Sequence, residues 1–325
     1  MTTPASRAEP AREPTHGAPV RIAYIGGWGR SGSTLLARML GEVPRYVNVG
    51  EIRDLFMRGI DEDRVCGCGV RFSECPFWTD VGETAFNGWD NVDLARLGEL
   101  RQLTDRPWHV PALLRPGLRK TTDRAVAEYG EFLVPLYRAM ASVADADVVI
   151  DSSKYASFAA ILRAIPSLDP RVVHLVRDPR GTLNSWMKEV RMSDDLDSAR
   201  YMPKYSVLNG GPRYLAYNLE MHAVARGIPS TFMRYEDLIE QPTAHLRQAL
   251  EMVGVGTDAD LSEIAGPQGV QLGSSHTVMG NPMRHQSGWI PLRADEAWKS
   301  DLGLRRRIAT TATTLPLIWR YRYEL

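Results

Sequence analysis

Cysteine is scarce in this chain: Cys66, Cys68 and Cys75 are the only three among 325 residues. Three closely spaced cysteines do not form the paired framework of small secreted domains, and their odd number fits a reducing cytoplasm. Net charge is also missing, because 39 basic residues balance 39 acidic ones. A neutral chain lacks the basic footprint of a non-specific nucleic-acid binder. We therefore expect a cytoplasmic protein without a nucleic-acid partner.

Long apolar runs are absent as well. No run approaches the roughly 18 residues of a membrane-spanning helix. Residues 1–19 are rich in proline, alanine and charge, and they lack the apolar segment of a secretory signal. We interpret them as a disordered tail ahead of a single domain over residues 20–325. With 44% apolar residues, the chain can bury a large core.

Short apolar segments alternate with helical patterns along the chain. The predicted strands cover residues 20–25, 46–49, 148–150, 172–176 and 231–234. This alternation predicts an α/β fold with a P-loop-like parallel sheet flanked by helices. Residues 52–145 carry few strand signals and are predicted to form a helical insertion. The Gly/Ser/Pro-rich residues 266–291 are predicted to form a long loop, which in a compact protein is typical of function or disorder.

A glycine-rich segment, GWGRSGSTLL, starts at Gly27, directly after the first predicted strand. The spacing from Gly27 to Gly32 is that of a phosphate-binding P-loop, and the helix that follows favours an anion at its N-terminus. An ATP- or GTP-hydrolysing loop has lysine directly after the second glycine. Here Ser33 and Thr34 follow instead, and the cation is Arg30, inside the loop. These differences disfavour nucleoside triphosphate hydrolysis.

This segment resembles the 5′-phosphosulfate loop of sulfotransferases, in the R-S-G-[ST]-[ST]-L form of the carbohydrate and tyrosylprotein branches. Those enzymes use 3′-phosphoadenylyl sulfate (PAPS) as donor. The resemblance implies that residues 29–35 cradle the 5′-phosphosulfate and that Arg30 stabilises charge on the bridging oxygen. The implied binding residues are Gly29, Arg30, Ser31, Gly32, Ser33, Thr34 and Leu35.

A second candidate phosphate site follows the strand predicted at residues 172–176. The sequence there is RDPRGTLNSW, in which Asp178 suits a helix N-cap and Pro179 a first helical residue. Arg177 offers a two-pronged contact to phosphate, and Ser185 on the following helix offers a hydroxyl. The pair resembles the 3′-phosphate-binding Arg and Ser of sulfotransferases. Two separate phosphate sites are what a 3′,5′-bisphosphorylated adenosine requires.

Glu51 is the candidate general base. It ends the second predicted strand in the sequence VGEIR. The tyrosylprotein branch has a Gly-Glu at a similar distance after its loop arginine, and that Glu is the base, so the resemblance implies the same role for Glu51. A histidine of the late loop, His276 or His285, is the alternative base. His174 lies inside a predicted strand and is expected to be a hydrogen-bonded core residue.

The sequence DSSK follows the third predicted strand and resembles family segments in which a lysine or serine contacts the sulfuryl group. By this resemblance Lys154 neutralises the leaving oxygen and Ser153 donates a hydroxyl, with Ser152 as the alternative to the lysine. A helix cap followed by a solvated lysine remains the alternative interpretation.

Two further segments resemble parts that close over the nucleotide. MRYEDL, from residue 233, resembles the segment on the adenine side, with Tyr235 as the contact. Residues 275–284 resemble the late loop, in which Arg284 or Ser275 would reach a phosphate. Core packing of the tyrosine is the competing interpretation.

The cysteine segment, CGCGVRFSECPFW, invites comparison with metal sites. Structural zinc sites use four ligands. Only three cysteines are present and no histidine is near in sequence, so we expect no metal. Similar stretches occur in related bacterial sulfotransferases, which implies a structural or acceptor-site role. A redox role remains open.

These features predict a PAPS-dependent sulfotransferase that transfers a sulfuryl group to a hydroxyl of a small molecule or glycan. The helical insertion and parts of residues 190–215 would shape the acceptor site, with Trp186, Met187 and Tyr201 among its lining. The alternatives are a P-loop kinase or related nucleotide triphosphate enzyme, and a non-catalytic nucleotide-binding protein.

Overall fold

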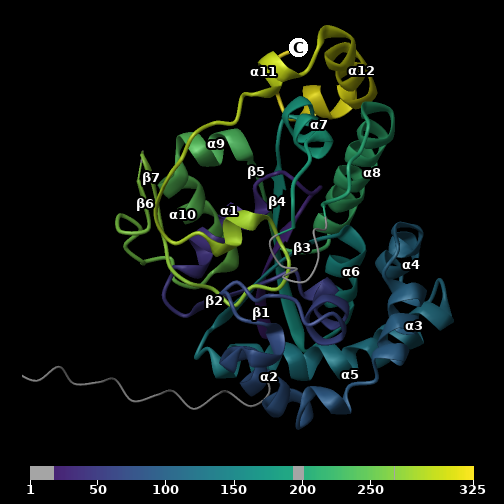
Figure 1. Ribbon diagram of the computed structural model, residues 1–325. Helices are drawn as coiled ribbons and strands as arrows, with labels where there is room; N and C mark the ends of the chain where they lie inside the picture. Colours follow the sequence, from purple (N-terminus) through teal and green to yellow (C-terminus); the bar gives the residue numbers. More distant parts are fainter. Residues whose placement is uncertain (1–17, 193–200, 267) are drawn as a thin grey trace, which may run out of the picture.

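A five-stranded parallel sheet forms the centre of the protein, in the strand order β2-β3-β1-β4-β5 (Figure 1). The computed structural model describes residues 18–192, 201–266 and 268–325. The strands are β1 (Val20–Gly26), β2 (Tyr46–Gly50), β3 (Val148–Lys154), β4 (Leu168–Val176) and β5 (Ser230–Arg234). All five predicted strands are present, and the predicted fold class is confirmed.

Helices cover both faces of the sheet. In β1, Ile22 and Tyr24 join the core on one face, whereas Ala23 and Ile25 join the core on the other. Because both faces are buried there, residues 22–25 of the strand are all apolar. One face packs against α1 (Ser33–Gly41), α9 (Tyr235–Glu240) and α10 (Pro242–Val253), and the other against α5 (Lys120–Val143), α6 (Ala156–Ala164) and α8 (Val207–Ala225). Figure 1 shows α9 and α10 on one side of the sheet and α6 and α8 on the other.

Between β2 and β3 the chain is helical. Its elements before α5 are η1 (Ile52–Asp54), η2 (Phe56–Asp61), η3 (Phe72–Glu74), α2 (Pro76–Phe86), η4 (Trp89–Asn91), α3 (Leu94–Thr104), η5 (Pro107–His109) and α4 (Val110–Leu114). Pro76 opens α2 and the Asp93 carboxylate caps α3, both good helix starts. Trp78 of α2 belongs to the same apolar core as Ile22 of the sheet. The insertion therefore packs onto the sheet.

A third, smaller core lies beyond the carboxyl end of the sheet. Trp28, Val176 and Leu183 pack there against Tyr214 and Leu317. The helices around it include α7 (Pro179–Met187), α11 (Trp298–Asp301) and α12 (Leu304–Arg320), next to the C-terminus in Figure 1. As predicted, the Asp178 side chain caps α7, and Pro179 is its first residue. None of the described helices combines the length and the apolar composition that a membrane crossing needs.

The prediction of one long loop over residues 266–291 is wrong in part. The segment contains a small antiparallel sheet of β6 (Ala265–Gly266), β7 (Gly269–Leu272) and β8 (Gly288–Pro291), together with η6 (Pro282–His285). Strands of two to four residues are too short to show an alternating pattern. Residues 273–281 are irregular, and Val278 forms an isolated bridge with Gly50 at the end of β2.

Candidate active site

A cavity of about 530 Å³ opens at the carboxyl end of the parallel sheet. This is the end at which open α/β sheets bind their ligands. The predicted site residues that line it are Gly29, Arg30, Gly32, Ser33, Thr34, Leu35, Glu51, Lys154, Arg177, Ser185 and Tyr235. Ser31, Ser153 and Arg284 are buried behind its walls. The residues that follow the five strands of the parallel sheet thus meet around one cavity, together with residues of the adjoining helices.

The loop between β1 and α1 has an unusual backbone. Gly27, Arg30 and Gly32 all have positive φ, at 129°, 70° and 90°. A Cβ on Gly27 would lie 2.3 Å from the carbonyl oxygen of Leu175, so only glycine fits there. Arg30 is strained as a non-glycine residue in this region, a feature that clusters at functional sites. Helix α1 begins at once, without a side-chain cap or an acidic residue in its first turn. Its first N–H groups are thus arranged as in anion-binding helix starts.

Arg30 is an incompletely paired cation at the cavity wall. Its Nε and Nη2 atoms are buried and have no hydrogen-bond partner among the described residues, and the same is true of Ser31 Oγ. The guanidinium carbon lies 5.5 Å from the centre of the Trp186 ring, whose Nε1 donates to the carbonyl of Gly29 at 3.0 Å. Buried donors without acceptors cost free energy. An anionic ligand in the cavity would provide acceptors for the Arg30 nitrogens.

Glu51 and Lys154 form an ion pair at the ends of β2 and β3. The main-chain N–H of Glu51 donates to Val278 at 2.9 Å, and the carbonyl of Lys154 accepts from Gly27 at 3.1 Å. The backbone at both residues is therefore fixed, and Lys154 is hydrogen-bonded directly to the phosphate loop. Burial raises the pKa of Glu51, while the charge and hydrogen bond of Lys154 lower it, and the net pKa lies above the usual value.

Two serines of β3 hold the backbone around Glu51. Ser153 Oγ accepts the main-chain N–H of Arg53 at 3.0 Å, and Ser152 Oγ donates to the carbonyl of Gly50 at 3.2 Å. Neither serine lines the cavity. The structure therefore gives Ser153 a supporting place behind the wall, in contrast to the predicted contact with the sulfuryl group.

Arg177 lies at the end of β4, on another wall of the same cavity. Its Nη2 donates to the main-chain carbonyl of Asp295 at 2.8 Å and pairs with the Asp295 carboxylate at 3.0 Å. Its guanidinium lies 4.8 Å from the centre of the Tyr235 ring, and Ser185 reaches the cavity from α7. Although burial raises the pKa of Asp295, the hydrogen bond and charge of Arg177 hold it below its usual value. A phosphate bound by Arg177 would compete with this carboxylate.

Arg284 does not reach the cavity. It is 1% exposed, and its Nη1 and Nη2 donate to the carbonyls of Thr277 and Val65 at 2.6 and 2.7 Å. The arginine thus ties the late loop to the segment after η2, and the predicted phosphate contact has no support in this geometry. Ser275, its alternative, is absent from the cavity lining too.

No histidine lines the cavity within the described ranges, so neither alternative base is placed beside the phosphate loop. His276 stacks on Phe77, with ring centres 5.0 Å apart. His174 is 2% exposed and lies 3.0 Å from Asn218 Oδ1, and burial lowers its pKa to about 3. The expectation that it is a hydrogen-bonded core residue is confirmed.

Trp186 was predicted to line the cavity, but its aromatic neighbours Trp28 and Tyr205 were not. Trp28 lies 5.3 Å from Trp186 between ring centres, and Trp186 lies 4.9 Å from Tyr205. Trp28 stands between two loop glycines, a position that could have identified it. Of the predicted lining residues Trp186 is present, whereas Met187 and Tyr201 are not in the cavity lining. Residues 193–200 of the predicted acceptor segment lie outside the described residues.

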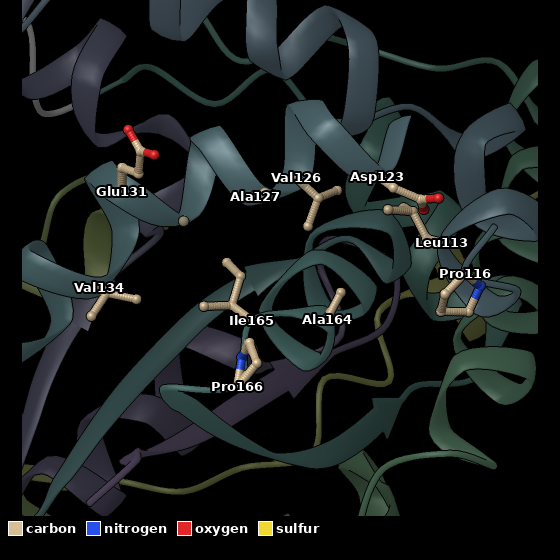
Figure 2. Close-up of a pocket in the computed structure, with 11 residues that line it drawn as sticks. Leu113, Pro116, Asp123, Val126, Ala127, Glu131, Val134, Ala164, Ile165 and Pro166 are labelled. Atoms are coloured by element: carbon tan, nitrogen blue, oxygen red, sulfur yellow. The ribbon is translucent and has the colours of Figure 1, made fainter. Parts of the chain in front are cut away.

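A second cavity, of about 610 Å³, lies between α5 and the connection from α6 to β4 (Figure 2). Figure 2 shows Val126, Val134 and Ile165 around it, with the carboxylates of Asp123 and Glu131 towards its ends. It is lined mainly by apolar side chains and contains none of the predicted site residues. The cavity at the carboxyl end of the sheet is therefore the candidate active site.

Residues 155–266 match the family model of the sulfotransferase domain. Among solved structures, the sulfotransferase domain from the Synechococcus PCC 7002 olefin synthase has a TM-score of 0.53 and 20% identity, covering 98% of this chain and 100% of that chain. The sulfotransferase domain from the curacin biosynthetic pathway has a TM-score of 0.49 and 17% identity, covering 94% and 99% of the two chains. No curated protein sequence matches the chain.

At this identity the olefin synthase domain supports the fold alone. The segment that matches the family model includes Arg177, Ser185 and Tyr235 of the cavity. Residues 155–266 are thus similar to the sulfotransferase domain, and the fold of the chain is similar to that of a solved sulfotransferase domain.

Proposed function

We propose that this protein transfers the sulfuryl group of PAPS to a hydroxyl of a small molecule or glycan. The observation that carries the proposal is the state of Arg30. Two of its nitrogens are buried without a partner among the described residues, in a cavity that Arg177 also lines. Two separated cations suit a donor that carries phosphate groups at both its 5′ and 3′ positions. None of the three cysteines is in a disulfide, which fits the proposed cytoplasmic location.

The residues divide between the two ends of the donor. In the proposal, the N-terminus of α1 and Arg30 hold the 5′-phosphosulfate, while Arg177 and Ser185 hold the 3′-phosphate. The Tyr235 ring, which packs against Gly32 and Arg177, would border the adenosine between them. These are the groups that line the cavity, so the fit to a bisphosphorylated nucleotide uses side chains already in place.

PAPS supplies a sulfuryl group bound to a phosphate that leaves readily. The acceptor oxygen forms a bond to sulfur as the bond between sulfur and the bridging oxygen breaks, and adenosine 3′,5′-bisphosphate is released. Glu51 takes the proton of the acceptor hydroxyl. Negative charge thereby moves from the Glu51 carboxylate to the leaving phosphate. Lys154, which is paired with Glu51, and Arg30 beside it stabilise that charge where it develops.

The acceptor would occupy the aromatic side of the cavity. Trp186, Tyr205 and Tyr217 line that side together with Met192 and Met202. Flat aromatic rings and flexible methionines suit the apolar face of a small molecule or sugar ring. We therefore place the acceptor hydroxyl between this wall and Glu51.

The proposal is tested first by thermal unfolding with four ligands: adenosine 3′,5′-bisphosphate, AMP, ADP, and ATP with Mg²⁺. A ligand at about 100 times its Kd adds about 2.7 kcal/mol to the free energy of unfolding, so the bisphosphate should raise Tm by several degrees. The other three should raise it less. A larger shift with ATP and Mg²⁺ would favour the kinase alternative and overturn the proposal. Binding of the bisphosphate, with no sulfuryl transfer from PAPS to any of a broad set of hydroxyl acceptors, would favour a non-catalytic protein.

Replacing Arg177 by alanine is expected to weaken binding of adenosine 3′,5′-bisphosphate by about 1.5–3 kcal/mol, the scale of a hydrogen bond to a charged group. AMP, which lacks the 3′-phosphate, should bind with nearly unchanged affinity. Calorimetric titration of both ligands measures the difference. Arg171→Ala is the matched control, since Arg171 is another arginine of β4 that pairs with Asp169 away from the cavity. Equal weakening of both ligands would remove Arg177 from the 3′-phosphate site.

A further inference from the structure

All three cysteines of the chain converge with one histidine outside the candidate active site. Their ligand atoms, the Sγ atoms of Cys66, Cys68 and Cys75 and a ring nitrogen of His276, all lie within 4.8 Å of one another. Cys68 Sγ and Cys75 Sγ are 3.7 Å apart. His276 Nδ1 lies 3.2 Å from Cys75 Sγ and 4.0 Å from Cys66 Sγ. Four groups that ligate soft metals therefore surround one point.

These spacings fit a tetrahedral zinc ion. Zinc–sulfur bonds of about 2.3 Å and zinc–nitrogen bonds of about 2.0 Å place neighbouring sulfurs about 3.8 Å apart, and sulfur about 3.5 Å from nitrogen. The 3.7 Å between Cys68 Sγ and Cys75 Sγ is close to the expected sulfur–sulfur spacing. The distances from His276 Nδ1, 3.2 and 4.0 Å, lie on either side of the expected sulfur–nitrogen spacing. Since no two of the ligand atoms are more than 4.8 Å apart, side-chain adjustments of about an ångström or less would complete the geometry.

The expectation of no metal depended on the lack of a histidine near the cysteines in sequence. The fold supplies one from 201 positions beyond Cys75. The main-chain N–H of Gly67 donates to Thr277 at 2.9 Å, which docks the cysteine turn onto the late loop. Stacking on Phe77 fixes the imidazole of His276 with Nδ1 towards the sulfurs. Backbone and ring contacts thus hold the four ligands close to one another.

We propose that Cys66, Cys68, Cys75 and His276 bind a structural Zn²⁺ ion. Three thiolates and one imidazole match the ligand preference of zinc, and four protein ligands leave no open position for water or substrate. A disulfide between Cys68 and Cys75 would use only two of the four groups. Such a disulfide would not explain why Cys66 and His276 point to the same place.

The ion would hold one wall of the candidate active site. Two residues after His276, the carbonyl of Val278 accepts the main-chain N–H of Glu51, and the chain then continues into Met279 and Gly280, which line the cavity. A bond from zinc to His276 would anchor this stretch to the cysteine turn. Loss of the ion is therefore expected to lower Tm and to loosen the loop that supports Glu51.

Metal counting tests the site directly and does not depend on the proposed activity. Tag-free protein produced in zinc-supplemented medium should contain one zinc per chain by plasma mass spectrometry. Cys68→Ser, at the least buried cysteine, and His276→Ala should each lower this content several-fold. His245→Ala, at a histidine of α10 outside the cluster, should keep it.

Cobalt substitution of the wild-type protein tests the ligands even where a variant fails to fold. One Co²⁺ per chain should give the thiolate-to-metal charge-transfer bands and the intense visible bands of a tetrahedral site. Less than a tenth of an equivalent of zinc in folded protein, or one equivalent of iron in its place, would overturn the assignment. A mass two hydrogens below that of the fully reduced chain, with no metal, would overturn it in favour of a disulfide.

Discussion

Glu51→Gln is expected to lower kcat about 10²–10⁴-fold, the range that a positioned general base contributes. Glutamine keeps the shape of the side chain and removes the carboxylate that takes the acceptor proton. Binding of adenosine 3′,5′-bisphosphate should stay within a few-fold of the wild-type value, because Glu51 is assigned to the acceptor and not to the nucleotide. Steady-state kinetics with PAPS, together with calorimetric titration of the bisphosphate, separates the two effects.

Glu220→Gln is the matched control for this variant. Glu220 is a partly buried glutamate of α8 whose pKa burial also raises, and it lies outside the cavity lining. It should leave kcat unchanged. A Glu51→Gln enzyme that retains near wild-type kcat at saturating acceptor would exclude Glu51 as the base.

The pH dependence of the reaction provides a second readout of Glu51. A base must be ionised, so kcat/KM should fall as the pH drops through the pKa of Glu51. Because burial raises that pKa, the acid limb should lie above the pH at which an exposed glutamate titrates. Lys154 lowers the pKa of Glu51, so Lys154→Met should move the limb to still higher pH. An acid limb that does not move in this variant would argue against the pairing of base and lysine.

Arg30→Met is expected to lower kcat about 10²–10³-fold, the cost of removing one preorganised donor from a developing oxyanion. The thermal stability of the ligand-free protein should not fall in this variant. Two nitrogens of Arg30 are buried without partners among the described residues, so their removal should leave Tm unchanged or raise it. Thermal unfolding with and without adenosine 3′,5′-bisphosphate should show a smaller ligand-induced shift than in the wild type.

Arg96→Met controls for the loss of an arginine, since Arg96 pairs with Glu128 and neither residue lines the cavity. It should preserve both kcat and the ligand-induced shift. If Arg30→Met lowers Tm of the ligand-free protein and leaves kcat intact, Arg30 stabilises the fold and does not serve the reaction.

The central sheet could be predicted because most of its strands contain a short apolar run that glycine or polar residues bound. VRIAYI and VVHLV both lie inside the observed β1 and β4. The small sheet β6–β7–β8 could not, because its strands are short and contain glycine, and β7 pairs with β8 across the intervening residues 273–287. Tertiary contacts decide that pairing, and local pattern does not record them.

Some parts of the candidate site could likewise be predicted from the sequence, and others could not. The phosphate loop and the helix that Asp178 caps are each encoded by a run of consecutive residues. Both could therefore be predicted from the sequence pattern alone. The predicted phosphate contact of Arg284 is not supported, because its guanidinium donates to the backbone carbonyls of Thr277 and Val65. Its position in the late loop did not reveal these contacts. The ligand set of Cys75 and His276 depends on a contact across 201 positions, which no spacing rule encodes.

Hydrogen bonds between residues far apart in the chain join the walls of the active-site cavity. The main-chain N–H of Asn281 donates to Thr34 Oγ1 across 247 positions, and Trp186 donates to Gly29 across 157. Such a topology has high contact order, because large loops must close before these contacts form. Because the lining extends to Asp295, the walls of the cavity are incomplete until that residue has been synthesised. A fragment that ends before residue 281 is therefore expected to bind the nucleotide more weakly than the full chain does.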